Sequence, residues 1–310
     1  MSDILLADIG GTTTRTGFAE PGGRPRGIVV VANDSFPDVE SLIAQSLAQS
    51  GLRPRAAVLA IAGPVDGDAV ALTNRSWRFR LADLSARFGM SFHAVNDFEA
   101  LAWGLTLLGA DDARTLGAAS PRRNGVKIVI GPGTGLGVAA LVPVKDGWHA
   151  VPGEGGHVSF GAASPDESAV FARLAADGAF VSAERVLSGP GLARLHRAVN
   201  PGVLAMPPEM ILTQARAGHR EARNTIALFV RLLGRFAGDM ALTFKAAGGV
   251  YIAGGVAFGL GALLDPALFR AAFEAHPPHQ ALLASIPTSL ITCEEPGLLG
   301  CSAFAARAGC

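Results

Sequence analysis

Lysine is scarce in this chain of 310 residues, and its scarcity excludes a large class of nucleotide-binding proteins. The sequence contains three lysines, Lys127, Lys145 and Lys245, and none of them follows a glycine. A P-loop protein needs a lysine directly after the last glycine of its phosphate-binding turn, so that class is excluded. The signature motifs of protein kinases, serine hydrolases and HExxH metalloproteases are absent from the sequence as well.

Cysteine and net charge are also low. The three cysteines all follow residue 292 and show no CxxC spacing, which predicts reduced thiols rather than a zinc site or a disulfide framework. The 26 Lys and Arg residues balance the 26 Asp and Glu residues, so the chain has no overall field to attract nucleic acid or an anionic membrane. An anionic ligand would have to be held by local geometry.

Long hydrophobic runs are missing too. The N-terminal segment lacks the basic region and the apolar stretch of a signal peptide. The uncharged stretch of residues 128–144 contains four glycines and two prolines, which favours strand, turn and strand over a membrane helix. We therefore predict a cytoplasmic protein that binds neither a membrane nor nucleic acid.

Glycine, by contrast, is abundant, with 39 residues. Apolar residues make up 49% of the chain and charged residues 17%, which predicts a compact globular fold. Strands come first and then alternate with helices, which predicts an α/β architecture with a partly parallel sheet. The expected strands are residues 4–9, 14–19, 27–31, 57–62, 92–96, 126–130, 138–144 and 250–253, and the expected helices are residues 39–49, 81–88, 98–108, 165–176 and 220–245, with one more helix after Ser182.

A pattern of strand, glycine turn and strand occurs twice and suggests a duplicated fold. The first turn is Gly10-Gly11-Thr12, directly after Asp8 and Ile9, and an ordinary hairpin is an equally good interpretation of it. The second turn, residues 131–137, has four glycines at alternate positions, which indicates that a ligand, most simply a phosphate, approaches its backbone. A dinucleotide-binding motif at residues 135–140 is disfavoured because a strand follows it instead of a helix.

Six segments resemble the bacterial glucokinase family, which belongs to the actin/hexokinase superfamily. They stand in that family's order and spacing, and the resemblance covers essentially the whole chain, down to Pro296–Gly300. The segments are residues 7–12, 96–98, 131–137, 152–157, 182–191 and 252–255.

The resemblance implies a two-lobed actin/hexokinase-like (ribonuclease H-like) α/β fold, with mixed sheets flanked by helices and a ligand cleft between the lobes. Residues 1–109 with 295–310 would form a small domain, and residues 110–294 a large one. The implied activity is a cytoplasmic, glycolytic phosphorylation of the 6-hydroxyl of D-glucose by ATP and Mg²⁺, giving glucose 6-phosphate and ADP. Family members tend to form dimers, so a homodimer is the expected assembly.

The resemblance also implies roles for individual residues. Asp97 matches the general base, which accepts the proton of the sugar hydroxyl as the oxygen–phosphorus bond forms; taken alone, an Asp at this position would also suit a helix N-cap. The expected glucose-binding residues are Asn96, Asp97, Glu154, His157 and Glu184.

The nucleotide and its metal would be held mainly by backbone groups. Asp8 matches the position that orients Mg²⁺, through water. Neither glycine turn contains a basic residue, so neutralisation of the phosphates is expected to rest on Mg²⁺ and backbone amides. The expected nucleotide-binding residues are Ala7, Asp8, Ile9, Gly10, Gly11, Thr12, Gly133, Thr134, Gly135, Gly254 and Gly255.

Two alternative functions remain. The substrate could be another hexose or amino sugar, such as mannose, fructose or glucosamine, because the sequence addresses specificity only through the family. A sugar-sensing regulator on the same fold would need a DNA-binding helix-turn-helix, and the first expected strand already begins at Ile4. A zinc-dependent N-acetylhexosamine kinase is disfavoured because no cysteine precedes Cys293.

Overall fold

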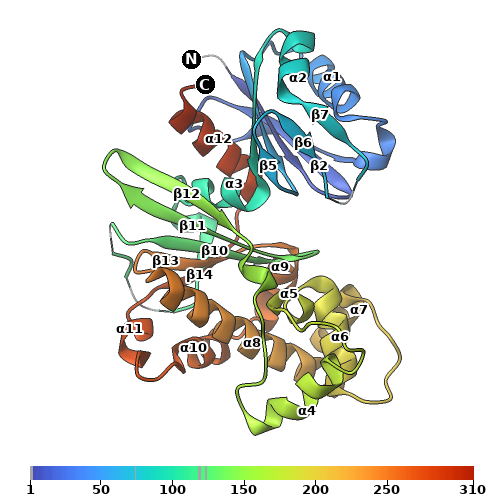
Figure 1. Cartoon of the computed structure of the whole chain (residues 1–310), viewed down its shortest axis with the longest axis vertical. Coiled ribbons are helices and arrows are strands. Elements are labelled where there is room, and N and C mark those ends of the chain that lie inside the picture. Colours follow the sequence, from blue (N-terminus) through green and yellow to red (C-terminus); the bar gives the residue numbers. More distant parts are fainter. Residues whose placement is uncertain (1–2, 74, 118–119, 123) are drawn as a thin grey trace. The chain divides into compact units, whose positions relative to one another are not determined.

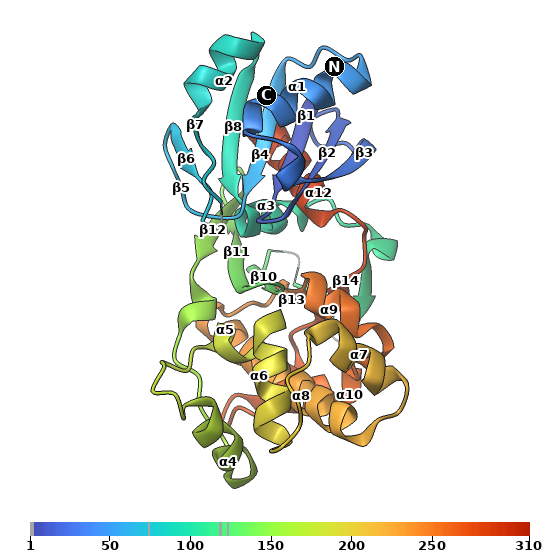
Figure 2. The ribbon, with the colours of Figure 1, turned by 90° about the vertical axis from the view of Figure 1, so that its right-hand side faces the viewer.

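The computed structural model describes residues 3–73, 75–117, 120–122 and 124–310. The chain forms two compact units (Figures 1 and 2), and each is described separately below. The first unit consists of Met1–Gly109, His149–Pro152 and Cys293–Cys310, and the second of Ala110–Trp148 and Gly153–Thr292. The described residues form three sheets flanked by helices, a mixed α/β fold.

The first unit is built on a five-stranded sheet in the order β3-β2-β1-β4-β8. Strand β1 (Ile4–Ile9) pairs antiparallel with β2 (Thr13–Ala19), and β2 pairs antiparallel with β3 (Arg26–Ala32). On its other side β1 runs parallel to β4 (Ala56–Ile61), which runs parallel to β8 (Ser91–Asn96). Because β1, β4 and β8 are parallel, their carboxyl ends meet at one edge of the sheet, the usual ligand-binding edge of such sheets.

Helices cover both faces of this sheet. Side chains alternate along a strand, so Leu5 of β1 faces the core cluster that contains α1 and α2 residues, whereas Leu6 faces the cluster that contains α3 and α12 residues. The apolar run of β1 is therefore buried throughout. The helices are α1 (Val39–Ser50), α2 (Leu81–Phe88), α3 (Asp97–Gly104) and α12 (Pro296–Ala308), and a small sheet is formed by β5 (Val65–Asp66), β6 (Ala69–Ala71) and β7 (Arg78–Arg80).

The second unit repeats the strand pattern of the first. Its six-stranded sheet has the order β12-β11-β10-β13-β14-β9. A hairpin of β10 and β11 is followed by two strands, β13 and β14, that extend the sheet from β10 in parallel, as β4 and β8 extend it from β1. The predicted duplication is confirmed. The strands are β9 (Ala113–Thr115), β10 (Lys127–Pro132), β11 (Leu136–Val144), β12 (Gly147–Gly153), β13 (Gly249–Ile252) and β14 (Thr288–Ile291).

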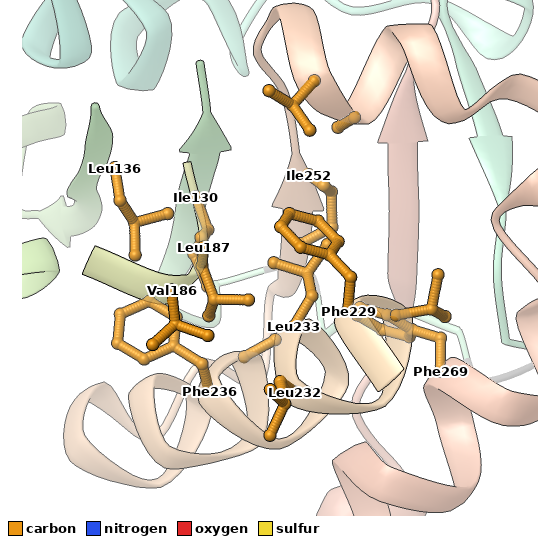
Figure 3. Packing of buried hydrophobic residues seen from close by; sticks show 14 of the residues in the cluster. Ile130, Leu136, Val186, Leu187, Phe229, Leu232, Leu233, Phe236, Ile252 and Phe269 are labelled. Atoms are coloured by element: carbon orange, nitrogen blue, oxygen red, sulfur yellow. The ribbon is translucent and has the colours of Figure 1, made fainter. Parts of the chain in front are cut away.

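One long helix, α8 (Arg220–Phe244), organises the core of the second unit. Figure 3 shows Phe229, Leu233 and Phe236 of this helix packed among side chains of the sheet and of neighbouring helices. The apolar spacing that predicted a helix over residues 220–245 thus marks its buried face. The other helices are α4 (Pro165–Leu174), α5 (Ala183–Val186), α6 (Gly189–Val199), α7 (Pro208–Arg216), α9 (Gly255–Leu260), α10 (Pro266–Glu274) and α11 (Gln280–Ala284), with 3-10 turns η1 (Asn33–Ser35), η2 (Ala110–Asp112), η3 (Gly155–His157) and η4 (Gly261–Leu263).

The helix caps follow the sequence signals closely. Ser164 and Ser182 cap α4 and α5 through hydrogen bonds from the amides three residues on, at 3.4 and 3.2 Å. The predicted helix over residues 98–108 is too long, because after Gly104 the amides of Leu105 and Thr106 donate to carbonyls three residues back and the helix tightens and ends.

The uncharged stretch of residues 128–144 forms strands β10 and β11, as predicted. Among the described residues, no single helix has the length and apolar character needed to cross a membrane. In the part of the chain that the structure describes, the segments Gly255–Leu263 and Pro266–Glu274 pass that test when taken together, and the chain bends by 115° between them.

Candidate active site

The first glycine turn joins β1 and β2 and is closed by a buried asparagine. The Gly10 amide donates to the Thr13 carbonyl at 3.0 Å. Asn33 is fully buried; its Nδ2 donates to the Gly10 carbonyl at 2.8 Å, and its Oδ1 accepts from the Thr14 hydroxyl at 2.7 Å. The turn is thus held by a buried residue that lies outside the predicted site motifs.

Asp8 lies at the carboxyl end of β1, beside this turn. Burial raises the pKa of the Asp8 carboxyl to about 6, although the nearby Arg15 guanidinium opposes the shift. Arg15 itself pairs with Glu295, with 2.7 Å between Nε and Oε2. A Cβ atom on Gly297, in the first turn of α12, would lie 2.5 Å from Asp8 Oδ2. Glycine at position 297 therefore makes room for the carboxylate.

A single carboxylate in this position suits a hydrated Mg²⁺. Among the described residues, no group of three His, Cys, Asp or Glu side chains could hold a metal ion by itself. Mg²⁺ usually keeps several waters and binds one or two carboxylates together with substrate phosphates. Asp8 next to the Gly10–Thr12 turn provides such a carboxylate, so the donor set fits Mg²⁺ held through water and by a nucleotide.

Asn96 and Asp97 follow β8 at the same edge of the sheet. Asn96 is the N-cap of α3: its Oδ1 accepts from the amides of Phe98 at 3.0 Å and Glu99 at 3.3 Å, and its Nδ2 donates to the Gly63 carbonyl at 3.1 Å. Asp97 is the first residue of the helix, and its Oδ1 accepts from the Phe98 amide at 2.9 Å. The capping role considered for Asp97 is therefore filled by Asn96, which also fixes the start of the helix that carries Asp97.

Arg75 brings a positive charge to the first glycine turn. Its guanidinium donates to the Gly11 carbonyl at 3.4 Å, pairs with Asp34 at 2.7 Å and lies 4.8 Å from the centre of the Trp77 ring. The expectation that only Mg²⁺ and amides balance the phosphates rested on the composition of the turns themselves. Arg75 reaches the turn from a distant part of the sequence and is paired there with the Asp34 carboxylate, so the expectation stays a prediction.

In the second unit, the three remaining sugar-site candidates lie on joined segments. Glu154 directly precedes η3 and His157 ends it, with 3.8 Å between Glu154 Oε2 and His157 Nε2; both side chains are exposed. The Ala183 amide donates to the Val158 carbonyl at 3.0 Å. This bond ties the η3 loop to α5, which carries Glu184.

The second glycine turn, between β10 and β11, contacts the segment at Gly254. The Gly133 amide donates to the Gly135 carbonyl at 2.8 Å. Gly254 has a φ of +88°, and a Cβ there would lie 2.6 Å from the Pro132 carbonyl oxygen, so only glycine fits. A cavity of about 240 Å³ beside Thr134 has a largely polar lining that includes Ser182, Glu184, Ser188 and Arg194. Thr134, a nucleotide-site candidate, and Glu184, a sugar-site candidate, thus line the same cavity in the second unit.

Comparison with known proteins gives one consistent result. The family model for glucokinases matches residues 5–308. The curated glucokinase of Chelativorans sp. (strain BNC1) is 40% identical over 310 residues, covering 97% of this chain and 91% of that protein. The glucokinase of Agrobacterium fabrum (strain C58 / ATCC 33970) is 38% identical over 314 residues, with the same coverage.

Solved structures agree on the fold. The crystal structure of a glucokinase from an Antarctic psychrotroph superposes with a TM-score of 0.91 at 28% identity and covers 99% of each chain. A ROK family glucokinase from Streptomyces griseus, solved in complex with glucose and AMPPNP, gives a TM-score of 0.68 at 24% identity, over 99% of this chain and 100% of that one. The predicted actin/hexokinase-like α/β fold is therefore confirmed.

Proposed function

The chain belongs to the glucokinase family, and on that premise we propose that it transfers the γ-phosphoryl group of ATP to the 6-hydroxyl of D-glucose, giving glucose 6-phosphate and ADP. The observation that carries the proposal is the 40% identity with a curated glucokinase over 97% of the chain. The placement of several site candidates supports it, because Asp8, Asn96 and Gly254 lie at the carboxyl ends of parallel strands.

Asp97 is the general base of the proposed reaction. A sugar hydroxyl is a weak nucleophile, and a carboxylate within hydrogen-bond reach accepts its proton as the bond to phosphorus forms. Asp97 stands in the first turn of α3, where the helix dipole stabilises negative charge. Asn96 holds this turn in place through the cap and the bond to Gly63.

Glucose is bound by groups that pair with its hydroxyls. The carboxylates of Glu154 and Glu184 accept hydrogen bonds and the His157 ring adds a further polar partner, with Asn96 and Asp97 completing the set. Specificity follows because a sugar that leaves one of these groups unmatched loses a hydrogen bond in the site. Exposure of Glu154 and His157 in the structure, with side-chain exposed fractions of 87% and 59%, leaves both accessible to a ligand.

The nucleotide phosphates lie against the two glycine turns, and the adenosine lies near Gly254 and Gly255. Asp8 would hold Mg²⁺ through water, and the bound ion would supply positive charge that stabilises the phosphates. Arg75, which is ion-paired with Asp34, places its guanidinium beside Gly11. This chain's own contribution is therefore a row of backbone amides, one carboxylate and one guanidinium that orient the phosphates.

The enzyme is proposed to act in the cytoplasm, in glycolysis, as a homodimer. An assay of ADP release tests the proposed activity directly, with glucose, mannose, fructose and glucosamine, each with and without Mg²⁺. We expect turnover with Mg²⁺ only and the highest kcat/KM for glucose. A higher kcat/KM for another sugar would overturn the substrate, and no ADP release with any sugar would favour a sugar-sensing role.

A further inference from the structure

We propose that Glu184 and Gly135 physically link the sugar site to the second phosphate turn, so that the turn sets the position of the sugar-binding carboxylate. The inference deepens the proposed function and rests on it, because that function places glucose at Glu184. It concerns residues of the second unit only.

The first observation is a hydrogen bond across the two sites. Oε2 of Glu184, on α5, accepts from the amide of Leu136 at 2.9 Å. Leu136 is the first residue of β11 and is buried, so this bond joins α5 to the end of the glycine turn. A carboxylate accepts through both oxygens. Glu184 can therefore receive a sugar hydroxyl while Oε2 holds the turn.

The second observation is the space that Gly135 leaves for this carboxylate. A Cβ atom on Gly135 would lie 2.5 Å from Oε2 of Glu184, whereas a Cβ on Gly133, in the same turn, would lie 4.0 Å from its nearest neighbour, the Gly255 amide nitrogen. The φ angle of Gly135 lies outside the left-handed region. A side chain at position 135 would therefore have to displace the Glu184 carboxylate, whereas the backbone conformation itself would accept one.

A third observation shows that the link is held at both ends of the turn. The Gly189 amide, at the start of α6, donates to the Gly133 carbonyl at 2.8 Å. The segment 184–189 is therefore hydrogen-bonded to the turn at two positions, Gly133 and Leu136. The polar cavity of about 240 Å³ is lined by residues from both the turn and this segment. We therefore expect a shift of Glu184 on sugar binding to move the turn, and nucleotide binding at the turn to change the affinity for sugar by linkage.

A matched pair of variants tests the link. Gly135→Ala places a methyl group against Oε2, and Gly133→Ala adds the same methyl group to the same turn without that contact. We expect Gly135→Ala to raise the Kd of glucose about tenfold or more, measured by isothermal titration calorimetry without nucleotide, because a displaced carboxylate loses charged hydrogen bonds. Gly133→Ala should keep that Kd within about twofold. Unchanged glucose affinity in a folded Gly135→Ala variant would overturn the proposal.

A second readout does not depend on glucose. Hydrogen exchange at the Leu136 amide should accelerate about tenfold or more in Gly135→Ala and in Glu184→Ala, and stay near the native rate in Gly133→Ala. The double variant Gly135→Ala/Glu184→Ala should exchange like Glu184→Ala alone, since both changes break the same bond. If the native protein binds no glucose while these rates behave as stated, the proposed function fails and the link stands. If Leu136 exchange is native-like in Gly135→Ala, the link itself is wrong.

Discussion

At the scale of single residues, Asp97 is the group on which the proposed chemistry depends most. Its backbone position is fixed by Asn96, which caps α3 and also donates to Gly63. Asp97→Asn therefore removes the base without removing the cap. We expect kcat to fall about 10²- to 10⁴-fold, the usual contribution of general base catalysis, while the Kd of glucose changes only a few-fold. Steady-state kinetics and calorimetry on the same preparation check both values.

Asn96→Ala is the informative counterpart of that variant. It keeps the carboxylate but removes the cap of α3, so it should lower the free energy of unfolding by about 1 kcal/mol.

Near-native turnover in Asp97→Asn, with the helix intact by circular dichroism, would show that another group accepts the proton.

Around the first glycine turn, the turn itself is predictable from the sequence, but the side chains that contact it are not. The motif from Asp8 to Thr12 predicts the turn, because glycines between two apolar runs are a local signal. Asn33 and Arg75 contact Gly10 and Gly11 from 23 and 64 residues away. Strand pairing and loop packing create such contacts, so no local sequence pattern predicts them. The same holds for Gly297, whose lack of a side chain accommodates Asp8.

At the scale of helices and strands, long periodic segments are predictable and short ones are not. Helix α8 and the hairpin of β10 and β11 follow directly from apolar spacing and from the glycines of the turn. Strands β5, β6 and β7 have two or three residues each, which is too short for an alternation of apolar and polar residues to be recognised. Strand β9 is equally short, and it is defined only by its antiparallel partner β14.

The packing of α6 against α8 contains a buried histidine that makes stability depend on pH. His196 is 2% exposed, and its Nδ1 lies 2.9 Å from the Thr225 hydroxyl oxygen. The Thr225 hydroxyl also donates to the Glu221 carbonyl at 2.9 Å. Burial lowers the pKa of His196 from its ordinary value of 6.5, although the charge of Glu221 opposes the shift. The folded protein thus favours the neutral ring.

The sign of the effect follows from linkage. The unfolded chain takes up this proton at a higher pH than the folded chain, so the free energy of unfolding falls as the pH drops below about 6.5. Urea unfolding at pH 8 and pH 5.5 should show a smaller loss in His196→Gln than in the native protein. His279→Gln, which changes an exposed histidine, is the control and should match the native protein. An equal loss in all three proteins would contradict the role of His196.

At the scale of the whole molecule, the two sheets share one plan. In each, the hairpin strand next to a glycine turn is extended by two parallel strands, and the glycine turn lies at the carboxyl end of that hairpin strand. This repetition explains why motifs far apart in sequence play matching roles: Gly10–Thr12 ends β1 in the first unit as Gly133–Gly135 ends β10 in the second. The sequence revealed the repeat because glycine turns recur, although the matching strand order appears only in the sheets themselves.

The exposed edge strand of the first sheet is a candidate surface for the proposed homodimer. Strand β3 is an edge strand, and Ile28, Val29 and Val30 expose 39%, 41% and 54% of their surface. An open, apolar edge is a ready template for another strand. We expect a second copy of this chain to pair there, because an antiparallel pair around a two-fold axis would set the uncharged residues 27–32 opposite one another with no like charges in contact.

A charge on this edge should therefore weaken self-association. We expect Val30→Lys to raise the dimer dissociation constant about tenfold or more in analytical ultracentrifugation, because each pairing would set two lysines near one another at a desolvated edge. Val144→Lys changes a valine of similar exposure, 43%, on β11 and should leave the constant unchanged. If Val30→Lys dimerises like the native protein, the dimer forms through another surface and the exposed side chains of β3 have no part in assembly.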